Sequence, residues 1–88
     1  MTYKQRLIKK LAERLVGVYE NCPFECNIYL DWGGEYSNRW LIGLWLDGND
    51  NVIAKIDWAG CTCNEPIEII PTRVIKDILV CMDEYNKK

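Results

Sequence analysis

The sequence predicts an α+β domain, in the order α-β-β-β-α, with two helices packed on one face of a three-stranded antiparallel meander. Apolar residues recur with helical spacing near both ends of the chain, two central segments alternate apolar with polar residues, and a third segment between them is apolar on both faces. Short stretches rich in Gly, Asn, Asp and Ser, residues that favour turns, connect the three central segments. The 88 residues are expected to form a single domain, 1–88, because two halves would each be too short to bury a sufficient core.

Residues 2–19 are predicted to form an amphipathic helix. Thr2 is a suitable N-cap, and the Cys22–Pro23 step ends the helix because the residue before a proline is disfavoured in the helical region. One face is apolar: Tyr3, Leu7, Ile8, Leu11, Leu15, Val18 and Tyr19. The other carries a basic row, interpreted as a solvated helix surface rather than a phosphate contact: Arg6, Lys10 and Arg14.

Three strands are expected next, at residues 26–32, 39–46 and 52–59, with a turn at 33–38 and a hairpin loop at 47–51. Pairing Leu46 with Val52 and Leu30 with Ile42 brings one apolar set to a single face, and a slip of one residue would undo this. In this register Gly43 lies between Tyr29 and Lys55. The set expected to face the helices is Cys26, Ile28, Leu30, Trp32, Trp40, Ile42, Leu44, Leu46, Val52, Ala54, Ile56 and Trp58.

The rest of the chain is predicted to contain an irregular segment and a second helix. Residues 60–70 show no clear period, although 67–70 has the composition of a short strand. Pro71 and Thr72 are helix start signals, and a stripe at helical spacing follows over 72–85: Ile75, Ile78, Leu79, Met82 and Tyr85.

The sheet face away from the helices is the first candidate for function. It is expected to expose apolar side chains within a charged rim, which is the composition of a binding patch. The alternative is that residues 60–70 or an unrecognised strand cover it, and burial of Trp45 by its own chain would remove the patch. The candidate partner-binding residues are Tyr29, Asp31, Leu41, Trp45, Ile53, Lys55 and Asp57.

Three tryptophans fall in one row at one end of the predicted sheet: Trp32, Trp40 and Trp58. We interpret them as the aromatic end of the core under the helices. The alternative is a stacking platform for nucleobases or a small ligand, which the acidic residues nearby disfavour.

Several classes of chemistry are disfavoured. The chain has no histidine and no glycine-rich phosphate loop, so we expect no enzyme and no cofactor. Five cysteines, an odd number, together with the lack of a secretory signal, predict reduced thiols and a cytoplasmic protein. Neither Cys22 and Cys26 nor Cys61 and Cys63 have the usual CxxC spacing, so no metal site is expected, and a redox or metal-transfer role for Cys61 and Cys63 stays open.

The distribution of charge favours an interaction protein. Residues 21–70 hold two basic and eight acidic residues, a net charge of −6, against −2 for the whole chain. We therefore expect a protein partner with a basic surface, rather than nucleic acid or a membrane. In size and charge the chain resembles small acidic inhibitors encoded by phages and mobile elements, including anti-CRISPR proteins.

Two alternative functions remain. The predicted element order resembles that of the double-stranded RNA-binding domain, which implies an RNA-binding module that grips phosphates with a basic cluster at the start of the second helix. Here that position offers only Arg73 and Lys76, with Asp77 adjacent. The other alternative is a structural homodimer joined sheet to sheet through Leu41, Trp45 and Ile53.

Overall fold

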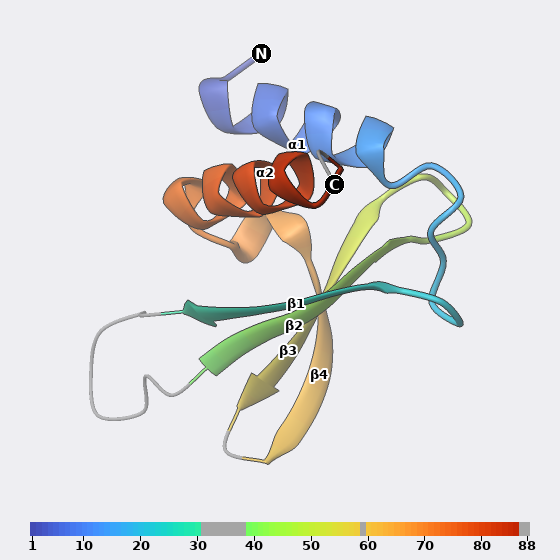
Figure 1. Ribbon diagram of the computed structural model, residues 1–88, viewed down its shortest axis with the longest axis vertical. Coiled ribbons are helices and arrows are strands. Elements are labelled where there is room, and N and C mark those ends of the chain that lie inside the picture. Colours follow the sequence, from blue (N-terminus) through green and yellow to red (C-terminus); the bar gives the residue numbers. More distant parts are fainter. Residues whose placement is uncertain (31–38, 59, 87–88) are drawn as a thin grey trace.

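The computed structural model shows a four-stranded antiparallel sheet with both helices on one of its faces (Figure 1). The structure describes residues 1–30, 39–58 and 60–86, with side chains up to Glu84. The elements are α1 (Tyr3–Arg14), β1 (Phe24–Leu30), β2 (Arg39–Leu46), β3 (Val52–Trp58), β4 (Cys61–Pro66), the 3₁₀ turn η1 (Ile67–Ile69) and α2 (Thr72–Asn86). The α+β class is confirmed, whereas the prediction of three strands is wrong.

The additional strand, β4, lies in the segment predicted to be irregular. It pairs with β3 from Trp58↔Cys61 to Ile53↔Pro66, after a turn in which Gly60 has a φ of +87°. All of its residues except Glu65 are exposed, so the strand needs no apolar alternation and gives no periodic pattern in the sequence. The strand expected at 67–70 is replaced by η1.

Helix α1 begins as predicted and ends earlier. Thr2 and Gln5 form a capping box, in which the Thr2 hydroxyl accepts from the Gln5 amide and the Gln5 side chain accepts from the Thr2 amide. The helix ends at Arg14, and Gly17 then adopts a φ of +88°, which reverses the chain direction. The Val18 carbonyl accepts a hydrogen bond of 3.0 Å from the Leu46 amide, so the released segment runs toward the end of β2.

One apolar core fills the space between the helices and the sheet. The apolar stripes of both helices contribute to it, and the Arg14–Asp83 ion pair links α1 with α2 on the surface. The core residues are Leu7, Leu11, Leu15, Leu30, Leu41, Leu44, Leu46, Val52, Ala54, Ile56, Ile67, Ile70, Val74, Ile75, Ile78, Leu79 and Met82.

The pairing of β2 with β3 starts as predicted, at Leu46↔Val52 and Leu44↔Ala54, and then shifts. Three residues of β2, 41–43, span only two of β3, so Leu41 rather than Ile42 lies opposite Ile56. The extra residue reverses the side-chain alternation beyond it. Leu41 therefore joins the core on the helix side, and Trp40 lies on the open face, the opposite of both predictions.

The pairing of β1 with β2 also differs from the prediction. Leu30 lies opposite Arg39 instead of Ile42, and a second irregularity falls between Glu25 and Ile28. Gly43 consequently lies between Glu25 and Lys55, not beside Tyr29. Trp32, predicted to pair with Trp40, lies outside the described residues. Apolar residues occur on both faces of β2, so hydrophobicity alone does not fix its register.

The hairpin loop between β2 and β3 is confirmed. The Asp47 carboxylate accepts hydrogen bonds from the Asn49 amide at 2.8 Å and from the Asn51 amide at 2.9 Å. These bonds lower the pKa of Asp47, because they stabilise its charged form.

Neither helix of the described residues is long and apolar enough to cross a membrane.

Candidate functional site

The sheet extends beyond the helices at the end where β1 and β3 finish and β2 and β4 begin (Figure 1). Of the residues that the structure describes, three aromatic side chains are exposed there: Tyr29 at 42%, Trp40 at 37% and Trp58 at 42%. We call this region the aromatic end. Exposed aromatic side chains of this size are typical of recognition surfaces, since each offers a large apolar area at a small cost in side-chain entropy.

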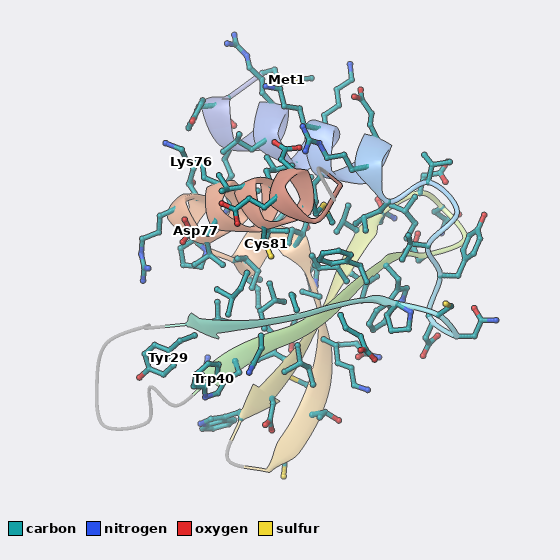
Figure 2. All side chains as sticks on the ribbon, in the orientation of Figure 1. Met1, Tyr29, Trp40, Lys76, Asp77 and Cys81 are labelled. Atoms are coloured by element: carbon teal, nitrogen blue, oxygen red, sulfur yellow. The ribbon has the colours of Figure 1, made fainter. Side chains whose placement is uncertain are left out.

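On the open face, the aromatic end carries a pair of contacting rings. Tyr29 and Trp40 lie on directly opposed positions of β1 and β2, and their rings meet edge to face with centroids 5.1 Å apart (Figure 2). Asp57 lies opposite Trp40 on β3, and Thr62 lies opposite Asp57 on β4. One row across all four strands therefore combines an aromatic pair, a carboxylate and a hydroxyl.

On the helix side, the aromatic end carries a cation–π contact. The Arg39 guanidinium lies over the Trp58 ring, 4.7 Å from its centroid. Both residues line a hollow of about 290 Å³ together with Ile56, Cys63, Glu65 and Ile69. This hollow is just below the volume of typical small-molecule sites, roughly 300–1,000 Å³.

The centre of the open face differs from the predicted patch. Trp45 has the expected orientation, outside the helix-side core, but is only 5% exposed. Tyr19, Glu20 and Asn21 line one hollow with it, and a Cβ on Gly43 would lie 3.8 Å from Pro23. The segment 19–23, released by the early end of α1, covers this part of the sheet. The prediction of an exposed Trp45 is therefore wrong.

The other residues of the predicted patch differ in the face on which they lie and in their burial. Leu41 is buried in the core on the opposite face, because of the shift in β2. Ile53, Lys55 and Asp57 lie on the open face and are half-buried. Tyr29 is exposed as predicted, and Asp31 lies outside the described residues. Of the three residues expected to join a sheet-to-sheet dimer, Leu41 and Trp45 are buried and Ile53 is half-buried.

Trp40 and Trp58, predicted to lie in the core, are both exposed. Only the row of tryptophans indicated that this end of the sheet was unusual. The two side chains point to opposite faces, so they do not form the continuous platform considered as the alternative.

The cysteines occupy distinct environments and all are free. Cys26 is half-buried, its thiol donates to the Leu41 carbonyl at 3.6 Å, and burial raises its pKa to about 12. The exposed cysteines are Cys22, Cys61, Cys63 and Cys81. Over the ranges 1–30, 39–58 and 60–86, no cluster of three or more cysteine or carboxylate side chains could hold a metal ion.

Comparison of the chain with protein families, curated proteins and solved structures finds no match.

Proposed function

We propose that this protein is a non-catalytic interaction module that binds a basic protein surface through the open face of the aromatic end. The observation that carries the proposal is the exposed Tyr29–Trp40 pair with Asp57 beside it, on a part of the sheet that the helices leave uncovered. Arginine and lysine side chains stack on such rings and pair with such carboxylates.

The charges of the whole molecule support a basic partner. Helix α1 contains five basic residues and one acidic residue. The sheet-bearing residues 21–70 carry a net charge of −6. The helical side therefore repels a basic surface and the sheet-bearing part attracts it, which favours approach with the sheet facing the partner.

An RNA-binding role has less support. The fourth strand departs from the element order of the double-stranded RNA-binding domain. Lys76, one of the two cations at the start of α2, lies over the Tyr3 ring at 5.9 Å from its centroid.

The size and charge analogy with small acidic inhibitors, including anti-CRISPR proteins, is compatible with a partner whose basic surface normally holds nucleic acid. It extends the proposal to an inhibitory role.

The proposal is tested with a short arginine-rich peptide as the probe, titrated into the labelled protein and followed by NMR. We expect shifts concentrated at the Trp40 indole and the Tyr29 ring, and binding that weakens as salt increases, because the attraction is screened. Tyr29→Ala with Trp40→Ala should abolish binding, which is followed in this variant by the backbone amide shifts of the remaining residues. The matched control is Tyr3→Ala with Val80→Ala, which removes exposed apolar side chains from the helices and should leave binding intact.

Two outcomes would contradict the proposal. One is peptide binding that is equal in both double variants, which would place the interaction elsewhere on the surface. The other is preferential binding of duplex RNA at the same salt concentration, which would favour the RNA-binding alternative. If the peptide binds as expected, capture experiments in a lysate of the native source, with the same pair of variants, would identify the partner.

A further inference from the structure

The free edge of the sheet at β4 is regular. Strand β4 is last in the order β1-β2-β3-β4, and its pairing with β3 runs through six consecutive residue pairs without a shift. The opposite edge, β1, is interrupted between Glu25 and Ile28. Bulges, lysines and internal prolines protect exposed edges from pairing. The stretch 61–64 of β4 has none of these, whereas Glu65 and Pro66 limit pairing at its far end.

Two exposed thiols lie on this edge, on one face of the sheet. Cys61 lies opposite Trp58 and Cys63 opposite Ile56, so both are on the helix side, away from the Tyr29–Trp40 pair. Residues at i and i+2 of a strand share a face. Thr62, between them, lies on the open-face side.

The symmetry of an edge-to-edge dimer makes these thiols complementary. Two antiparallel edge strands related by a two-fold axis perpendicular to the sheet place one residue opposite its own copy. With Thr62 at that position, Cys61 of each copy lies opposite Cys63 of the other, and Glu65 and Pro66 stay outside the paired stretch. With Asn64 there instead, Pro66, which has no N–H group, enters the ladder opposite Thr62. The Thr62 register also pairs two threonines, a favourable cross-strand combination.

We propose that a second copy of this chain pairs antiparallel with β4 in the Thr62 register, forming a continuous eight-stranded sheet with Cys61 facing Cys63 at two equivalent places. Opposed Cβ atoms in antiparallel sheets are about 4.5–5.5 Å apart. A disulfide needs about 3.5–4.5 Å, so a small adjustment allows each pair to be linked. The interface leaves the open face of the aromatic end free, and its test is independent of the proposed partner binding.

The test is a complementation experiment with diamide as the oxidant. For each disulfide, one Cys61 thiol and one Cys63 thiol lose two protons and two electrons in total, and the diazene N=N bond of diamide is reduced to a hydrazine. All variants carry Cys22→Ser and Cys81→Ser, which remove the other exposed thiols. Covalent dimer is measured on non-reducing gels and by intact mass.

The Thr62 register predicts which variants form a covalent dimer. Cys61→Ser alone leaves Cys63 opposite a serine, and Cys63→Ser alone leaves Cys61 opposite a serine, so neither should cross-link efficiently. An equimolar mixture of the two restores one Cys61–Cys63 pair per mixed dimer and should cross-link roughly tenfold faster or more, because pairing raises the effective thiol concentration. Cross-linking in each single variant as fast as in the mixture, or no covalent dimer in the mixture, would overturn the proposal. Since only exposed side chains are changed, all variants are expected to fold.

Discussion

At the scale of single residues, Cys26 shows how the fold changes a side chain's chemistry. The thiol lies half-buried against the core and donates to the Leu41 carbonyl. Its pKa is raised to about 12, first because burial disfavours the thiolate and second because of Cys81 nearby. The thiolate is the reactive form of cysteine, so Cys26 should be the least reactive of the cysteines described as free.

We predict that iodoacetamide at pH 8 labels Cys22, Cys61, Cys63 and Cys81 at least tenfold faster than Cys26 in the folded protein, a ratio set by thiolate fraction and access. Peptide mass spectrometry over a time course measures each rate. Labelling in urea is the control, and there the rates should converge. Comparable rates in the folded state would contradict the environment assigned to Cys26.

The same pKa predicts how stability changes with pH. The folded value, about 12, lies above the ordinary value of 9.0, so the folded state binds the proton more tightly than the unfolded state. This contribution is fully present below pH 9 and is lost as the pH rises through 12. Urea midpoints measured from pH 8 to 11 should fall more steeply for the protein than for Cys26→Ala, and equal slopes would count against the assignment.

Some residues of the site could be predicted from the sequence and others could not. Tyr29 is exposed as its place in an alternating strand indicates, whereas Trp45 is covered by a segment that lies 22 or more positions away in the sequence. A pattern read along a strand specifies which side chains share a face. It contains no information on which distant segment covers that face, because the cover depends on where α1 ends.

At the scale of elements, the extra residue in β2 determines which side chains enter the core. Helix α2 was predicted to within one residue, because a periodic apolar stripe extends over several turns, whereas α1 ends at Arg14 rather than at Tyr19. Strand β4 was not predicted, since an exposed edge strand without apolar alternation is stabilised by its pairing with β3 rather than by burial. The shift in β2 was hidden because Leu41 and Ile42 are equally apolar, and either fits the core by composition.

The shift predicts unequal costs for truncating these two neighbours. Leu41 is fully buried, so Leu41→Ala should cost about 2–5 kcal/mol in free energy of unfolding. Ile42 is half-buried, and Ile42→Ala should cost clearly less, about 1 kcal/mol. Urea unfolding followed by circular dichroism measures both. A larger cost at Ile42 would indicate that β2 alternates without interruption, as the sequence pattern alone implies.

At the scale of the whole molecule, the sheet is longer than the helices that cover it. Both helices pack on one face of the sheet (Figure 1), and Tyr29 and Trp40 on the opposite face and Trp58 on the helix side remain exposed. This arrangement gives three parts of the molecule different roles. The core stabilises the fold near the helices, the aromatic end offers recognition surface, and the β4 edge offers a place for a second copy.

The shift in β2 turns the Trp40 side chain toward solvent, whereas the segment 19–23 covers the Trp45 side chain. This difference in exposure is central to the account, and it is tested most directly by ¹⁹F NMR of protein labelled with 5-fluorotryptophan, with resonances assigned through single Trp→Phe variants. A soluble gadolinium chelate broadens resonances of exposed indoles and spares buried ones. We predict strong broadening for Trp40 and Trp58 and little for Trp45. A protected Trp40 together with a broadened Trp45 would contradict the account.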